Sequence, residues 1–137
     1  EGVLPSRYVV TADGFTRRGQ YRDAIDFLRN AIAENPNDSQ AWVAMGNALV
    51  EHANGTLSEA AEFAYARAKA TDPGNAAADY FHGIVLIRNS RFDEGRALWA
   101  AALEAAPQDA SYRSTLAARL AVLDQAMGRI EQERSAE

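Results

Sequence analysis

Two segments of the chain repeat one residue pattern, and this repetition constrains the fold more than any other feature of the sequence. Residues 20–36 read QYRDAIDFLRNAIAENP, and residues 91–107 read RFDEGRALWAAALEAAP. In both segments an aromatic residue is second, a small residue is fifth, an alanine is twelfth and a proline is last. Each segment reads as a helix ended by its proline. Because the same helix pattern occurs twice, we expect the same helix–helix packing interface to form twice.

Three prolines divide the chain into units of similar length. Pro36, Pro73 and Pro107 each end a helical stretch, and they lie 37 and 34 residues apart. Periods near 34 residues with two helices per unit are typical of stacked helical hairpins. One hairpin cannot cover its own apolar face, so the next hairpin must stack on it. We expect a single domain over residues 1–137, with units at about 5–36, 39–73 and 76–107 and a solvating helix at 108–133.

The repeated pattern resembles the tetratricopeptide repeat (TPR). Trp42, Gly46 and Leu49 stand at the positions of that family's first-helix signature, and the two repeated segments match its second-helix signature. Asp79 departs from the pattern where a tryptophan is usual, and Gly95 departs from it where an alanine is usual. The resemblance implies an all-α, right-handed α-solenoid of three hairpins plus a C-terminal capping helix. The seven expected helices cover about 5–18, 20–35, 39–53, 57–71, 75–89, 91–106 and a last stretch ending near 133.

Composition excludes several classes of function. The chain has 14 basic and 19 acidic residues, a net charge of −5 and no cysteine. This balance argues against nucleic acid, which requires a basic face, and against an anionic membrane surface. The missing cysteines exclude disulfides, thiol catalysis and covalent haem attachment. No apolar run is long enough to span a membrane, but the chain begins at Glu1 and leaves an upstream anchor or export signal open.

The sequence contains no group of residues with the spacing that is typical of a catalytic or metal site. His52 ends a predicted helix and is expected to face solvent, whereas His82 is expected to be packed against the partner helix. Neither is spaced with carboxylates as a metal site or catalytic triad requires. We therefore predict no catalytic residues, no cofactor, no metal and no enzyme activity.

The resemblance to TPR domains also implies a ligand groove along the first helices of the three hairpins. We expect the apolar groove residues to form an exposed strip, which usually marks a partner site. A helix or an extended peptide would lie in such a groove. The alternative is that the last helix or a segment before the first helix covers the strip. The predicted groove residues are Val9, Asp13, Arg17, Val43, Asn47, Val50, Glu51, Tyr80, Ile84, Ile87 and Arg88.

A closer resemblance concerns the end of the last repeat. The stretch NPNDSQAWVAMGNALV and the later FDEGRALWAAALEAAPQDASYRSTLAARLAVL are similar to the TPR domain of bacterial cytochrome c maturation proteins of the CcmI/CycH/NrfG group. That resemblance implies a chaperone-like partner of apocytochrome c, which binds its C-terminal helix and passes it to the haem-ligation machinery. It also implies a periplasmic location, often behind an N-terminal anchor. The alternatives are a general TPR scaffold that joins folded partners in an unrelated complex, and a cytoplasmic location.

Overall fold

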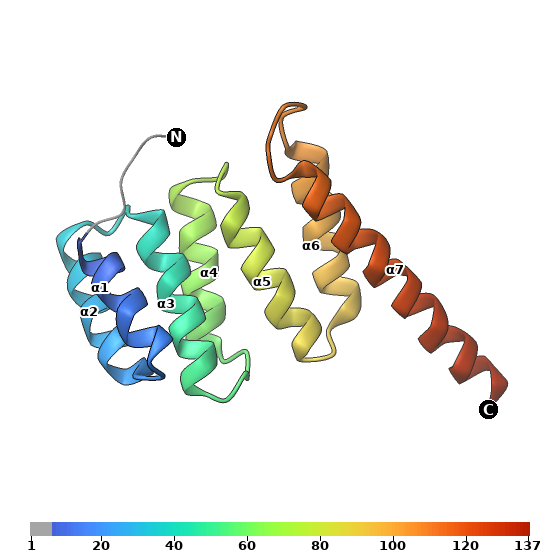
Figure 1. Ribbon diagram of the computed structural model, residues 1–137, viewed down its shortest axis with the longest axis horizontal. Coiled ribbons are helices and arrows are strands. Elements are labelled where there is room, and N and C mark those ends of the chain that lie inside the picture. Colours follow the sequence, from blue (N-terminus) through green and yellow to red (C-terminus); the bar gives the residue numbers. More distant parts are fainter. Residues whose placement is uncertain (1–6) are drawn as a thin grey trace.

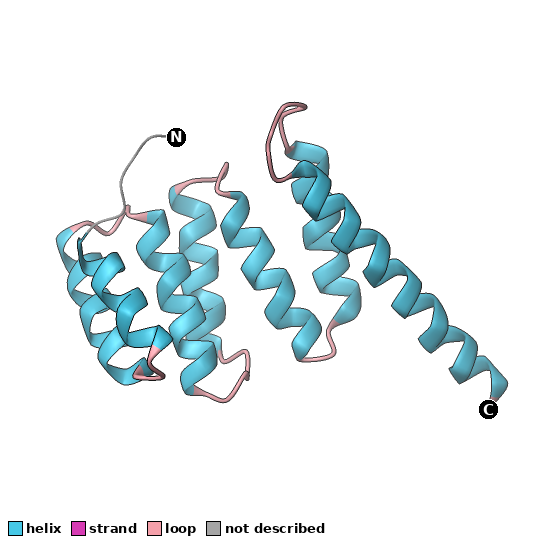
Figure 2. Ribbon diagram, viewed as in Figure 1, coloured by secondary structure: helices cyan, strands magenta, loops and turns pink. Residues whose placement is uncertain are grey.

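The computed structural model describes residues 7–137, and this part of the chain forms seven helices without a strand (Figures 1 and 2). The expected all-α class and helical solenoid are thereby confirmed. Pro5 and Ser6, where the first helix was expected to begin, lie outside the described residues. The helices are α1 (Arg7–Arg17), α2 (Tyr21–Glu34), α3 (Ser39–His52), α4 (Glu59–Thr71), α5 (Ala76–Arg88), α6 (Phe92–Ala105) and α7 (Arg113–Ala136).

Local sequence sets the helix ends. Helices α2, α4 and α6 each end two residues before one of the three evenly spaced prolines, because a proline restricts the residue before it to extended backbone. At the starts of α3, α4 and α5, the side chains of Asp38, Ser58 and Asn75 each accept a hydrogen bond from a backbone N–H of the first turn. These caps satisfy donors that have no partner within the helix.

The helices pair into antiparallel hairpins that stack in chain order. Helix α1 packs on α2, α3 on α4 and α5 on α6, while α2, α4 and α6 contact the first helix of the next unit. The first helices also contact one another, α1 with α3 and α3 with α5. Figure 1 shows the resulting row of helices, with α7 after the third hairpin. The inner face of the solenoid is therefore built from α1, α3 and α5.

Glycines let two of the hairpins close tightly around an aromatic ring. A Cβ atom added at Gly46 would lie 2.7 Å from the ring of Tyr65, and one added at Gly83 would overlap the indole of Trp99. Tyr65 and Trp99 are both buried. Each of these hairpins thus needs a glycine on its first helix to accommodate a large ring from its second helix.

The middle hairpin has a longer connection than the other two. Residues 53–58 join α3 to α4, whereas 18–20 and 89–91 join the other pairs, so this loop is three residues longer than the other two. Asn89, just after α5, holds the loop from the neighbouring hairpin. Its Nδ2 donates to the carbonyl oxygen of Gly55 at 3.0 Å, and its Oδ1 accepts from the backbone N–H of Leu57 at 3.2 Å.

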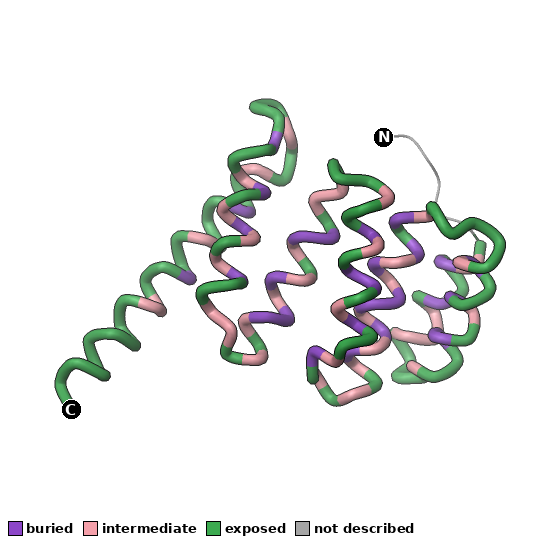
Figure 3. Tube along the Cα trace, turned by 180° about the vertical axis from the view of Figure 1, so that it is seen from behind, coloured by how far each residue is buried: buried purple, intermediate pink, exposed green. Residues whose placement is uncertain are grey.

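Burial falls along the last helix. Buried residues concentrate in the middle of the molecule, and the far end of α7 is exposed (Figure 3). Leu116 and Leu123 pack on Trp99 of α6, but no residue beyond Leu123 in the described chain is buried. Helix α7 continues to Ala136, slightly beyond the expected end near 133. Its first half belongs to the core and its second half projects from it.

Candidate functional site

A hollow on the inner face of α1, α3 and α5 brings four of the predicted groove residues together. Its volume is about 410 Å³, and its lining includes Val9 and Asp13 of α1 and Val43 and Asn47 of α3. Phe81 of α5 also lines it and is 37% exposed. We call this the first hollow. Its remaining lining residues are Thr16, Leu28, Gln40, Ala44, Asn75 and Ala77.

Asn47 and Asp13 are two of the five polar side chains that line the first hollow. The Oδ1 atom of Asn47 accepts a hydrogen bond from the hydroxyl of Tyr65 at 2.6 Å, and burial raises the pKa of that hydroxyl above its usual value, so it stays a donor. The amide nitrogen of Asn47 and the carboxylate of Asp13 have no partner within residues 7–137. The first hollow therefore offers a fixed amide donor and one negative charge.

The predicted charged residues Glu51, Arg88 and Arg17 are less accessible to a ligand of the first hollow than Asp13 is. Glu51 and Arg88 are bonded to each other at 2.8 Å across α3 and α5, and both are partly exposed. A ligand would have to compete with this ion pair to reach either charge. Arg17 is exposed at the end of α1 and does not line the first hollow.

The expectation that the groove valines form an exposed strip is wrong. Val9, Val43 and Val50 are all buried, and Val50 is only 1% exposed. The first helices of neighbouring hairpins touch one another, so side chains between them are covered. Val9 and Val43 still border the first hollow, whereas Val50 packs with Tyr65 in the core. Their part in binding stays a prediction.

Helix α7 covers part of the predicted groove residues on α5. Coverage of the strip by the last helix was the alternative expected from the sequence. Tyr80, Ile84 and Ile87 are half-buried and belong to the cluster that contains Trp99 and the inner residues of α7. The ring of Tyr80 stacks on Trp99 with centroids 5.8 Å apart. The guanidinium of Arg119 lies 5.5 Å from the centroid of the same tyrosine. These residues are therefore walls between α5 and α7 and do not form an open strip.

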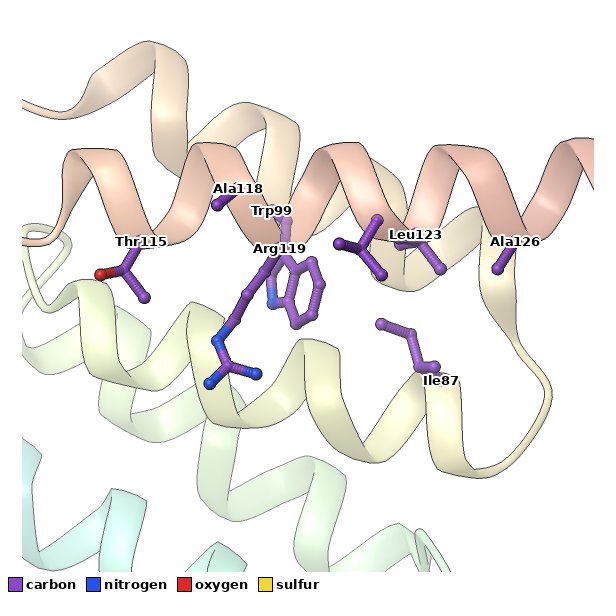
Figure 4. Close-up of a pocket in the computed structure, with 8 residues that line it drawn as sticks. Ile87, Trp99, Thr115, Ala118, Arg119, Leu123 and Ala126 are labelled. Carbon is purple, nitrogen blue, oxygen red and sulfur yellow. The ribbon is translucent and has the colours of Figure 1, made fainter.

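Two further hollows lie between α5 and α7. The second hollow, about 360 Å³, is lined by Ala76, Ala77, Tyr80, Tyr112, Thr115 and Leu116. The third hollow, about 560 Å³, is lined by Ile87, Trp99, Thr115, Ala118, Arg119, Val122, Leu123 and Ala126 (Figure 4). Ala77 lines both the first and the second hollow, and Thr115 lines both the second and the third. The three hollows are therefore neighbours that share lining residues, and we call them together the trough.

Sequence reasoning missed the contribution of α7 and of Phe81. The sequence predicted Tyr80 as a groove residue and not its neighbour Phe81, whereas Phe81 lines the first hollow and Tyr80 lines the second. In α7 the apolar residues Leu116, Leu120, Leu123 and Met127 form the face that packs on α6. A second face at positions 115, 118, 119, 122 and 126 lines the third hollow. The i, i+3, i+4, i+7 and i+11 spacing of those positions is the signal that could have revealed it.

Other reactive groups do not form a site in the part of the chain that the structure describes. Residues 7–137 contain no cluster of metal-ligating side chains and no helix long and apolar enough to cross a membrane. His82 is half-buried as expected, but its ring stacks on Tyr65 of α4, in the preceding hairpin, with centroids 5.0 Å apart. Its Nε2 is buried without a hydrogen-bond partner among these residues, and burial lowers the pKa of the imidazole.

Comparison by sequence finds one family and one curated relative. Residues 10–76 match the tetratricopeptide repeat family. The cytochrome c-type biogenesis protein CycH of Bradyrhizobium diazoefficiens is 31% identical over 104 residues, which are 76% of this chain and 28% of the relative. The chain thus spans little more than a quarter of the length of that relative.

Comparison by structure finds the same architecture in proteins of distant sequence. The type III secretion translocator chaperone SycD of Yersinia enterocolitica, in complex with a peptide of the translocator YopD, has a TM-score of 0.76 at 14% identity, covering 91% of this chain and 92% of that chain. The first TPR of Spaghetti (RPAP3), bound to the HSP90 peptide SRMEEVD, has a TM-score of 0.71 at 16% identity, covering 88% of this chain and 93% of that chain. At such identities the likeness concerns the fold alone.

Proposed function

This chain is a tetratricopeptide-repeat protein that resembles CycH, and from that premise we propose that its trough binds a peptide segment of a partner protein. The partner we propose is an apocytochrome c, whose C-terminal region would be held during cytochrome c maturation. Binding would be non-catalytic. It would take place in the periplasm, with any membrane anchor lying outside residues 7–137.

The observation that carries the proposal is the trough itself. The second and third hollows are mostly apolar, with Thr115 and Arg119 as polar side chains, whereas the first hollow combines apolar residues with the polar side chains of Asp13, Thr16, Gln40, Asn47 and Asn75. Apolar surface contributes affinity, and a few placed polar groups fix the register of a ligand. The relative named for cytochrome c biogenesis supports the choice of client. The two solved TPR structures with bound peptides support the choice of a peptide as ligand.

The test is a titration with a fluorescent peptide from the C-terminal region of an apocytochrome c, followed by anisotropy. We expect micromolar binding, or about 8 kcal/mol. Phe81→Ala should weaken binding by about tenfold, because the lost ring contact corresponds to about 1.5–3 kcal/mol of apolar burial. The matched control is Phe63→Ala on α4, since Phe63 is 59% exposed and lies outside the trough.

The control also separates the alternative function. A general scaffold would use a surface outside the trough, and Phe63 packs edge-on against Trp42 with centroids 5.8 Å apart, on such a surface. If Phe63→Ala abolishes binding and Phe81→Ala leaves it unchanged, the scaffold is the better description. If the peptide does not bind at all, the proposed client is wrong.

A further inference from the structure

We propose that the third hollow, between α5 and α7, docks an amphipathic helix of a partner protein that carries an acidic residue opposite Arg119. The inference rests on the proposed peptide-binding function of the trough and adds the position of a bound helix and the charge that it carries opposite Arg119. It does not require that the partner be an apocytochrome c.

The third hollow exists because α7 does not continue the stacking of the inner helices. Helix α1 contacts α3 and α3 contacts α5, whereas α7 packs against α6 and makes no comparable contact with α5. Figure 4 shows Trp99 between the two helices, with Ile87 reaching from α5 and Leu123 from α7. The angle of α7 therefore leaves an apolar space with a tryptophan at its base.

The wall contributed by α7 suits a packed helix. Ala118, Val122 and Ala126 are spaced by four residues and form one ridge that lines the third hollow. Val122 is 64% exposed, and the two alanines beside it would let another backbone approach closely. The adjacent face of α7, with Leu116 and Leu123, is already packed on α6, and Leu123 lies at the border of the two faces. Helix α7 thus has a second apolar face for which the described chain provides no cover.

A helix fits this space better than an extended peptide. The walls are helices, whose backbone groups are bonded internally, so they offer no strand edge to which a peptide could add. The lining provides one charged side chain and one hydroxyl, from Arg119 and Thr115. An extended segment would bury backbone N–H and C=O groups without partners, whereas a helix satisfies its own.

The charge of the third hollow selects an acidic ligand. Arg119 is exposed and contacts the ring of Tyr80, and it has no carboxylate partner among residues 7–137. No acidic residue lines the hollow. The whole chain is acidic, with a net charge of −5, so an unpaired arginine within an apolar lining stands out. A carboxylate at the border of a bound apolar face would pair with it.

The experiment uses two synthetic 18-residue amphipathic helices that differ only in one glutamate or lysine at the border of a leucine–alanine face. We expect calorimetry to show about five- to tenfold tighter binding of the glutamate peptide to the unmodified protein. Arg119→Glu should reverse that preference. The matched control is Arg22→Glu on α2, which makes the same charge change at an exposed arginine outside the three hollows and should keep the preference. Equal binding of both peptides, or equal effects of both variants, would overturn the proposal.

The position of the bound helix is tested with single fluorescent labels, which the absence of cysteine makes simple. Val122→Cys places a label in the third hollow, and Gln40→Cys places one in the first. The glutamate peptide should change the emission of the label at position 122. A change in emission at position 40 alone contradicts the proposal. A change at position 122 when the protein is concentrated without peptide also contradicts it, because another copy of the chain would then occupy the hollow.

The same labels separate this inference from the proposed client. If the apocytochrome peptide fails to bind while the glutamate helix is detected at position 122, the client is wrong and the helix site stands. If the apocytochrome peptide binds and changes only the label at position 40, the peptide function stands and the helix site is wrong.

Discussion

At the scale of single residues, the packing of the hairpins depends on pairs of one glycine and one large ring. Gly46 faces Tyr65, and Gly83 faces Trp99. The sequence contains a glycine at both positions, and Gly46 belongs to the first-helix signature of the TPR family. It could not predict which ring would fill each gap. Trp99 also donates its Nε1 hydrogen to the carbonyl oxygen of Tyr80 at 3.2 Å, a contact that depends on the exact approach of the two helices.

His82 gives a prediction for the pH dependence of stability. Its Nε2 is buried without a partner among the described residues, and burial is the main cause of its lowered pKa. Arg91 lowers the pKa further, while Glu62, Asp79 and Glu94 oppose the shift. The folded protein therefore binds a proton less readily than the unfolded chain, whose histidine titrates near pH 6.5. The contribution of His82 to stability is fully present above pH 6.5 and is lost as the pH falls through that value toward the folded pKa.

The measurement is urea unfolding at pH 7.5 and pH 5.5. His82→Phe keeps a ring beside Tyr65 and removes the titration, so this variant should lose less stability on acidification than the unmodified protein. The difference is at most about 1.4 kcal/mol per pH unit. His52→Phe is the control, because His52 is exposed and this variant should keep the original slope. Identical slopes for all three proteins would mean that His82 is protonated without cost in the fold.

At the scale of elements, the loops between helices link neighbouring hairpins. Substitution of Asn89 tests how much this link contributes to stability. Its side chain donates to the carbonyl oxygens of Gly55 and Val85 and accepts from the N–H of Leu57. Asn89→Ala leaves partly buried backbone groups unpaired, so we expect a loss of about 1–3 kcal/mol in urea unfolding. Asn30→Ala on the exposed surface of α2 is the control and should be nearly neutral. A neutral Asn89→Ala would show that water replaces these bonds.

The sequence predicted the elements better than their relative positions. Prolines and capping residues act locally, so helix ends followed from Pro36, Pro73 and Pro107. The burial of Val50 did not follow from the sequence, because it depends on how closely α3 and α5 approach. The role of α7 in the trough depends on the angle at which it leaves α6, and nothing near residue 113 in the sequence encodes that angle locally. The burial of a residue that faces a neighbouring helix is therefore predicted correctly only where the repeat pattern also determines the position of that helix.

At the scale of the whole molecule, stability should decrease from the centre of the solenoid toward α7. In stacked repeats each unit is stabilised mainly by its neighbours, so an element with one neighbour opens more easily than one enclosed on both sides. Helices α3 and α4 lie between two hairpins and contain Val50, Tyr65 and Ala68, all at most 1% exposed. Helix α7 has one main neighbour, and its residues after Leu123 are not buried.

Hydrogen exchange followed by mass spectrometry tests this gradient. Amides of α3 and α4 should exchange most slowly, and those of residues 124–136 should exchange within the shortest labelling times despite their helical backbone. Bound glutamate helix should slow exchange in residues 115–126, where the ridge of α7 meets the third hollow, and leave residues 130–136 unchanged. Uniform protection along the whole of α7 in the free protein would contradict the gradient, because it would require a partner for the projecting half of the helix, such as a second copy of the chain.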